Sequence, residues 1–255
     1  MTTFAIEPRH RLEHPPGERV FLSTEWRDLV MLNYEVDSEL LAQNVPRGTE
    51  LHAFERRVYV SLVGFRFMRT KLFGCVPLPL HTNFEEVNLR FYVKRREGNE
   101  ERRGVVFIRE IVPRFAVAHL ARVAYGENYV CHPMRHRVQA NGEGIAAEYQ
   151  WQVGDAWCRL RAEASGTPDY AAEGSLDQFI TEHYWGYSAQ RNGGCVEYQV
   201  AHPPWRAWKA TVAAFEGDAE PLYGRELARV LRRPPDSAFI AEGSPVLVFA
   251  GRRIA

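Results

Sequence analysis

One predicted strand carries four side chains that together could bind a small acid. Residues 87–93 alternate apolar and polar, which is the pattern of a β-strand with two different faces. If the polar face lines a barrel, its guanidinium could bind a carboxylate while its own carboxylate orients the ligand or moves a proton. A strand side that faces solvent gives the same alternation, so both interpretations stay open. The polar face consists of Glu86, Asn88, Arg90 and Tyr92.

A second group of charged residues surrounds the next apolar strand. Arg109 and Glu110 interrupt residues 104–112, and Arg114 follows Pro113. A fixed guanidinium here could hold a carboxylate through two parallel hydrogen bonds, whereas an ion pair at the strand end is the alternative. Neighbouring strand residues face opposite sides, so Arg109 and Glu110 share a cavity only across a bulge. The candidate catalytic residue is Glu86, and the candidate ligand-binding residues are Arg90, Arg114, Asn88, Tyr92 and Arg109.

Metal and cofactor chemistry has weaker support in the sequence. Cys131, His132 and His136 are ligand types that zinc uses, but on a strand the thiol would point away from the two imidazoles. There is no Gly-rich phosphate loop, no HExxH and no GxSxG motif. We therefore predict no metal site and no cofactor.

Lysine, the residue that forms a Schiff base with a carbonyl, is scarce. The chain holds only Lys71, Lys94 and Lys209, whereas arginine is abundant. Few positions could therefore supply an amine nucleophile.

The elements that would position these residues are mostly antiparallel hairpins. Loops at 95–103 and 154–155 join pairs of strands. These features predict an α+β fold, mainly antiparallel β, and not an alternating βαβ sheet. We expect strands at 58–63, 87–93, 104–112, 145–153, 156–161, 195–200 and 246–250, and helices at 37–46, 113–126, from 175 toward 185, at 205–215 and at 223–232.

Composition limits the protein class. We expect a loose arm over residues 1–18 and one domain over residues 19–255. Lys+Arg and Asp+Glu are both 32, so the net charge is zero and nothing indicates a nucleic-acid partner. No apolar run could span a membrane, and the first residues lack the pattern of a signal peptide. The four scattered cysteines suit free thiols, so we predict a cytoplasmic protein.

A set of segments, in a fixed order, resembles a known family. Together they resemble the YqjF-like family of uncharacterised proteins over about residues 21–209, and that family is thought to be related to acetoacetate decarboxylase. The resemblance implies an acetoacetate decarboxylase-like fold, with a central β-barrel or cone, a few peripheral helices and a buried site, and it implies a homo-oligomer. The segments are 26–30, 39–41, 45–46, 83–93, 104–114, 125–129, 179–185 and 202–205.

The resemblance also marks a departure from decarboxylase chemistry. Residues 109–111 match the start of the motif that carries the Schiff-base lysine, but Pro113 and Arg114 stand where proline and lysine would be. Glu86 matches the active-site glutamate. Arginine stays protonated and is no amine nucleophile. The resemblance therefore implies a pocket for a small carboxylate or keto acid without Schiff-base decarboxylase activity.

Three functions remain open on the sequence alone. The first is a protein that binds a small carboxylate-bearing ligand. The second is an enzyme, such as a lyase, isomerase or hydrolase, that acts on a keto acid without covalent lysine catalysis. The third is a structural or interaction protein whose pocket is filled by its own side chains.

Overall fold

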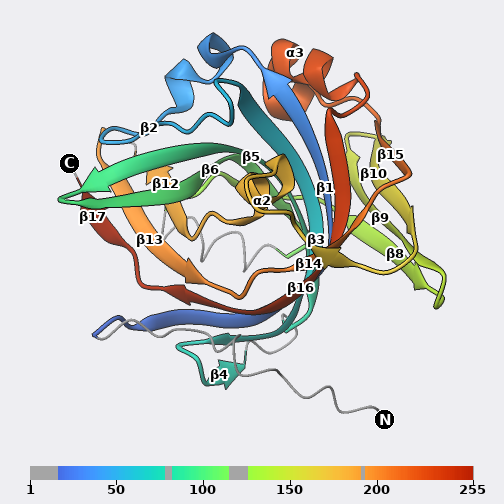
Figure 1. The fold of residues 1–255 in the computed structure, drawn as a ribbon, viewed down its shortest axis with the longest axis horizontal. Helices are drawn as coiled ribbons and strands as arrows, with labels where there is room; N and C mark the ends of the chain where they lie inside the picture. The colour runs from blue at the N-terminus through green and yellow to red at the C-terminus, as the bar shows by residue number, and fades with distance from the viewer. Residues whose placement is uncertain (1–16, 78–81, 115–125, 191–192, 255) are drawn as a thin grey trace.

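Long strands form a closed ring in the computed structural model, which describes residues 17–77, 82–114, 126–190 and 193–254. The neighbours around the ring pair in the order β16, β1, β3, β5, β6, β12 and β13, and β13 then pairs with β16 (Figure 1). Every pair in the ring is antiparallel except β6 with β12. The ring strands are β1 (Val20–Val36), β3 (Val58–Leu72), β5 (Phe84–Glu97), β6 (Glu100–Val112), β12 (Trp185–Ala189), β13 (Cys195–Ala201) and β16 (Ser237–Phe249).

Short strands extend this sheet at its margins. β7 runs parallel to β6 and brings residues after 125 beside the ring. These strands are β2 (Glu50–Leu51), β4 (Val76–Pro77), β7 (Tyr129–Cys131), β11 (Asp169–Tyr170), β14 (Arg206–Lys209) and β17 (Arg252–Ile254).

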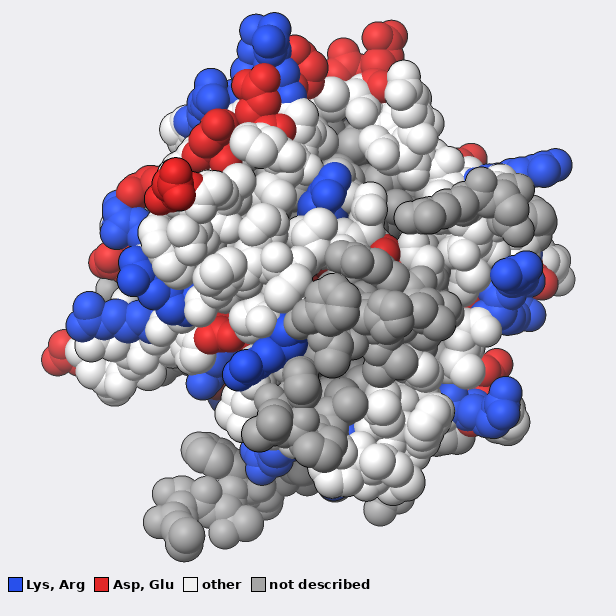
Figure 2. Space-filling model, turned by 180° about the vertical axis from the view of Figure 1, so that it is seen from behind, with Lys and Arg blue, Asp and Glu red and all other residues white. Residues whose placement is uncertain are grey.

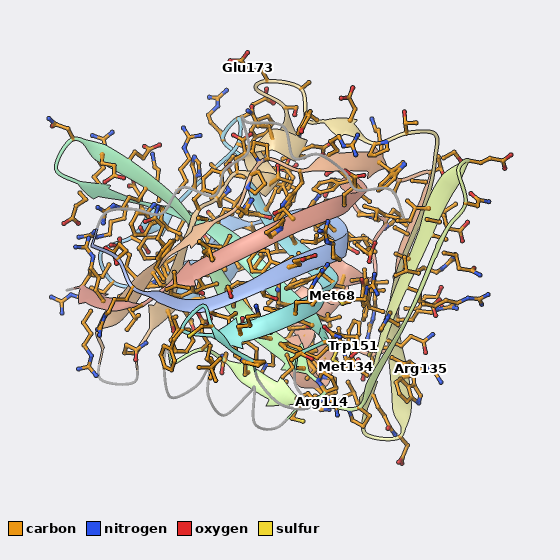
Figure 3. All side chains as sticks on the ribbon, turned by 90° about the horizontal axis from the view of Figure 1, so that it is seen from below. Met68, Arg114, Met134, Arg135, Trp151 and Glu173 are labelled. Atoms are coloured by element: carbon orange, nitrogen blue, oxygen red, sulfur yellow. The ribbon has the colours of Figure 1, made fainter. Side chains whose placement is uncertain are left out.

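A second, 4-stranded sheet packs outside the ring. Its order is β15-β10-β9-β8, and it stands apart from the ring on one side, with Trp151 and Met134 directed into the space between the two (Figure 3). Trp151 is fully buried there. The strands are β8 (Met134–Ala140), β9 (Gly144–Val153), β10 (Ala156–Ser165) and β15 (Val212–Glu216).

The described residues form three hydrophobic clusters, and β5 separates the two largest. Its apolar face, which includes Val87, Leu89 and Phe91, packs outward with the second sheet and with α3. Its other face points into the ring, where Phe84 and Tyr92 join the inner core. The alternation predicted for residues 87–93 is therefore correct, and its polar side faces the inside of the ring instead of solvent.

The helices are few, and the fold class is the predicted one. α2 (Leu176–Thr181) begins at Ser175, whose side chain accepts a hydrogen bond from the Gln178 amide, as its capping pattern predicts. α3 (Glu220–Leu231) confirms the helix expected at 223–232. Residues 37–46 form two 3₁₀ turns, Ser38–Leu40 and Ala42–Asn44, in place of one α-helix, although Asp37 caps the first turn.

One predicted helix is wrong. Residues 205–215 hold β14 and β15, because Ala207 and Trp208 pair with β16 and Ala213 pairs with β10. Helical periodicity placed two tryptophans on one face, and long-range strand pairing overrides that local pattern. The predicted helix at 113–126 lies largely outside the described residues. The strand expected at 246–250 is the end of β16, which begins much earlier, at Ser237, and β17 follows it.

The charged surface agrees with the zero net charge. On the face in Figure 2, basic and acidic side chains alternate around the margin without a large patch of one sign. In the described parts of the chain, no helix is long and apolar enough to cross a membrane.

Candidate functional site

A cavity lies inside the ring, with polar groups along one wall. Its volume is about 150 Å³, a size that can hold a benzene-sized molecule. Much of the wall is aromatic or aliphatic. The charged and amide side chains in the wall are Glu86, Asn88, Arg90, Glu110 and Glu127, and phenols are contributed by Tyr129 and Tyr198.

The inward face of β5 supplies the first three of these groups. Glu86, Asn88 and Arg90 are 2%, 1% and 8% exposed. The Asn88 amide donates a hydrogen bond to Glu86 Oε1 over 2.9 Å, and the Tyr129 hydroxyl donates to Oε2 over 3.0 Å. Both carboxyl oxygens of Glu86 are therefore held in place, and its position in the cavity is fixed.

A bulge in β6 decides which of its charged residues enters the cavity. Leu89 pairs with Arg109 but Arg90 pairs with Phe107, so β6 has one extra residue at this point. The bulge shifts the alternation, and Phe107 and Glu110 both line the cavity. Arg109 consequently lies on the opposite, outer face of β6.

Glu110 and Glu127 form a carboxyl pair beside Glu86. A side-chain hydrogen bond joins Glu110 and Glu127, which requires a proton on one of them. The Tyr198 hydroxyl donates to Glu127 Oε1 over 2.7 Å. Glu110 Oε2 is buried without a hydrogen-bond partner among the described residues. Glu110 is assigned as the protonated member, because burial and the neighbouring Glu127 and Glu86 raise its pKa well above its usual value, whereas the pKa of Glu127 rises to about 7.

Burial shifts the proton affinity of all three acids. Burial raises the pKa of Glu86 to about 7, against the opposing effects of Asn88, Tyr129 and Arg90. Burial also raises the pKa of Glu127 to about 7, against the bond from Tyr198. The pKa of Glu110 lies well above its usual value because of burial and of the nearby Glu127 and Glu86. The cavity therefore holds carboxylic acids that can keep their protons near neutral pH.

Arg90 is the one arginine or lysine in the described cavity wall. No carboxylate of the described residues lies within 4.0 Å of its guanidinium, and its Nε is buried without a hydrogen-bond partner. Its Nη2 is 3.8 Å from Met31 Sδ, a weak acceptor, and its guanidinium lies 5.8 Å from the centre of the Tyr92 ring. A buried charge without a partner costs several kcal/mol, so this arrangement favours an incoming anion.

Two histidines in the wall are electrically neutral. Burial lowers the pKa of His202 to about 4, and burial together with His52 and Arg90 lowers the pKa of His183 well below its usual value. His183 Nε2 lies 3.0 Å from His52 Nδ1. The Arg90 charge lowers the pKa of both wall histidines, so the guanidinium lies close enough to influence both.

Three predicted ligand-binding residues do not line the cavity. Tyr92 is buried in the inner core with its hydroxyl 2.6 Å from Ser61 Oγ. Arg109 is turned to the outer face by the bulge. Arg114 is exposed at the periphery (Figure 3), and its charge lowers the pKa of Glu85. Glu110 was not predicted as a site residue, because the bulge in β6 cannot be recognised in the sequence. Glu127, Tyr129 and Tyr198 were not predicted either, because they reach the cavity from segments that are distant in the sequence.

The cysteine and histidine group does not come together. Cys131 is exposed, and His136 Nδ1 lies 2.6 Å from Glu85 Oε1. Within the described residues, no three His, Cys, Asp or Glu side chains are arranged to hold a metal ion.

The missing side chain of Gly186 makes room for the phenol that holds Glu127. A Cβ at Gly186 would lie 2.1 Å from Cζ of Tyr198, its cross-strand neighbour. We expect Gly186→Ala to destabilise the protein by about 1–3 kcal/mol in urea unfolding, because the Tyr198 ring must move. Gly142→Ala, where the Cβ meets nothing within 4 Å, is the control and should change little. Equal stability of the two variants would contradict this placement of Tyr198.

The closed ring and its cavity define an acetoacetate decarboxylase-like fold. The chain is similar to acetoacetate decarboxylase from Legionella pneumophila, with a TM-score of 0.63 and 13% identity over 100% of this chain and 92% of that chain. It is also similar to the enduracididine biosynthesis enzyme MppR in complex with pyruvate, with a TM-score of 0.62 and 14% identity over 95% of this chain and 92% of that chain. Identities this low show the fold alone.

The sequence comparisons show the family. The chain belongs to the DUF2071 family of uncharacterized conserved proteins, whose model matches residues 23–245. The uncharacterized protein YqjF of Bacillus subtilis is 26% identical over 193 residues, which are 75% of this chain and 76% of that protein. The predicted resemblance to the YqjF-like family is therefore confirmed.

Proposed function

We propose that the protein binds a small carboxylate-bearing molecule, such as a 2-oxo acid, in the cavity inside the ring. The observation that carries the proposal is Arg90, a buried guanidinium in the cavity wall with no carboxylate partner among the described residues. Its planar fork of donors matches a carboxylate. The likeness to a fold in which MppR holds pyruvate adds support.

We further propose that the ligand stays unlinked to the protein. Schiff-base chemistry needs a lysine amine in the site. All three lysines of the chain are in the described residues, and none is in the cavity wall. Lys71 and Lys209 are exposed, and Lys94 lies 3.5 Å from both Glu50 and Glu101.

Borohydride trapping tests the unlinked state. We expect the intact mass of the protein to stay unchanged after treatment with pyruvate or acetoacetate and borohydride, because no imine forms to be reduced. Mass spectrometry of the intact chain and of its peptides provides the measurement. A reduced adduct on any of the three lysines would contradict the proposal.

Ligand affinity should fall as the pH rises through neutrality. Glu86 is faced by Asn88, Tyr129, Arg90 and the carboxyl pair, and its pKa is about 7. Below that pH a neutral Glu86 leaves Arg90 to the ligand, whereas above it an ionised Glu86 repels the ligand anion. We expect calorimetric affinity for pyruvate to drop about tenfold or more between about pH 6 and about pH 9. In Glu86→Gln the drop should be much smaller, and a wild-type affinity that rises with pH would contradict this account.

Catalysis on a keto acid is the second candidate, and the Glu86 carboxyl favours it. An acid with a pKa of about 7, held beside a guanidinium, suits the transfer of a proton to or from a bound 2-oxo acid. Consumption of a bound acid would distinguish this function from binding alone. The cavity of about 150 Å³ counts against a structural protein with a filled pocket.

A further inference from the structure

An aromatic cluster forms a large part of the cavity wall. Trp26 lies at its centre, with ring centroids 5.4 Å from Phe65, 6.0 Å from Phe67, 6.1 Å from Trp205 and 6.2 Å from His202. All five rings line the cavity. We call these five residues the Trp26 cluster.

The strand register places Trp26 and Phe67 of this cluster level with Phe84 of β5, and it places Phe65 level with Glu86. Trp26 pairs with Phe67, and Phe67 pairs with Phe84, so these three form one row across β1, β3 and β5. Glu86, Asn88 and Arg90 follow Phe84 on the same face of β5. Successive residues on one face of a strand are about 7 Å apart, and Arg90 follows Glu86 by two such steps and Phe84 by three. A molecule that contacts both the Arg90 guanidinium and the rings of the Trp26 cluster must therefore be longer than a three-carbon acid.

Hydrogen bonds and stacking hold the cluster in place before any ligand enters. The Trp205 indole donates to Ser244 Oγ over 2.9 Å, and His202 stacks on Trp205 at 4.2 Å. Phe67 stacks on Phe84 at 4.6 Å. A preformed apolar wall of this kind binds apolar groups without first being ordered.

We propose that the Trp26 cluster selects the tail of the ligand, so that the ligand is a carboxylic acid with a bulky branched or aromatic tail. This inference rests on the proposed function, since the carboxylate is held by Arg90. His202, whose pKa is about 4, is uncharged at neutral pH, so the Trp26 cluster carries no charge there. Burial of each added methylene should raise the affinity about fourfold.

A series of acids with one head group and increasing tails tests the inference. Calorimetric titration with pyruvate, 2-oxobutanoate, 4-methyl-2-oxopentanoate and phenylpyruvate should give affinities that rise along the series, with phenylpyruvate at least about 30-fold tighter than pyruvate. Equal affinities, or affinities that fall with length, would overturn the inference while the proposed function survives. Failure of all four acids to bind would overturn both.

Variants separate tail selection from general binding. Trp26→Leu should reduce the ratio of phenylpyruvate to pyruvate affinity at least about tenfold, because the tail loses its aromatic contact. Trp157→Leu, at an indole 37% exposed on β10, is the matched control and should keep the wild-type ratio. If thermal unfolding shows that Trp26→Leu does not fold, Phe67→Leu replaces it as the test variant. A wild-type ratio in a folded variant of the cluster would overturn the inference.

Discussion

Replacing Arg90 with methionine should greatly weaken carboxylate binding and at the same time stabilise the ligand-free protein. Loss of one member of a buried charge pair costs about 2–5 kcal/mol, so the affinity for a 2-oxo acid should fall about 30-fold or more. Without ligand, Arg90 holds a buried charge that contacts Met31 Sδ and the Tyr92 ring and has no carboxylate within 4.0 Å among the described residues. An apolar side chain of similar length removes that burial cost, and we expect a gain of about 1–3 kcal/mol in the free energy of unfolding.

The opposite signs of the two effects distinguish a binding residue from a structural one. Arg96→Met replaces an exposed arginine on the same strand and is the matched control. Urea unfolding and calorimetric titration of both variants provide the measurements. A clear loss of stability in Arg90→Met would mean that Arg90 holds the ring together, and it would contradict an anion site.

Replacing Glu127 with glutamine should stabilise the protein at high pH only. The pKa of Glu127 is raised from 4.5 to about 7 in the folded state, mainly by burial. Below about pH 4 the acid is protonated in both folded and unfolded chains and adds nothing. As the pH rises toward 7, the unfolded chain ionises first, and the folded protein loses stability. A shift from 4.5 to about 7 corresponds to roughly 3 kcal/mol.

Glutamine is neutral at every pH and avoids that loss. It keeps an oxygen to accept the bond that Tyr198 donates to Glu127 Oε1 over 2.7 Å. In urea unfolding we expect Glu127→Gln to match the wild type near about pH 4 and to exceed it by roughly 3 kcal/mol near about pH 8. Glu143→Gln, at an exposed loop position, should show no such gain. A variant that is less stable than wild type at the higher pH would show that an ionised Glu127 supports the fold.

Local alternation predicted the part of the site that lies on one strand. Alternate residues of a strand face the same side, so residues 86, 88 and 90 were expected to share one face. The structure has them on one face because β5 contains no bulge there. Alternation could not place Arg109, because β6 has a bulge between Phe107 and Arg109. At the bulge, the side chains of β6 change the side of the sheet that they were expected to face. One extra residue in a strand leaves no clear mark on composition or spacing.

The other site residues and the wrongly predicted helix depend on contacts between segments that are distant in the sequence. Glu127 and Tyr198 are 71 residues apart and meet because Glu127 lies just before β7, which pairs with β6, and only β12 separates β6 from β13 in the ring. Residues 205–215 carry a helical spacing of tryptophans, yet they pair with β16 and β10. Tertiary pairing of this kind overrides local propensity, and a single sequence does not display it.

The most direct test of the anion site is a crystal structure of the protein soaked with 4-methyl-2-oxopentanoate or pyruvate. The account predicts density for the acid inside the ring, with its carboxylate within hydrogen-bond distance of the Arg90 guanidinium and no covalent bond to a lysine. A ligand bound outside the ring, a carboxylate turned away from Arg90, or a closed ion pair between Arg90 and Glu86 in an empty cavity would contradict it.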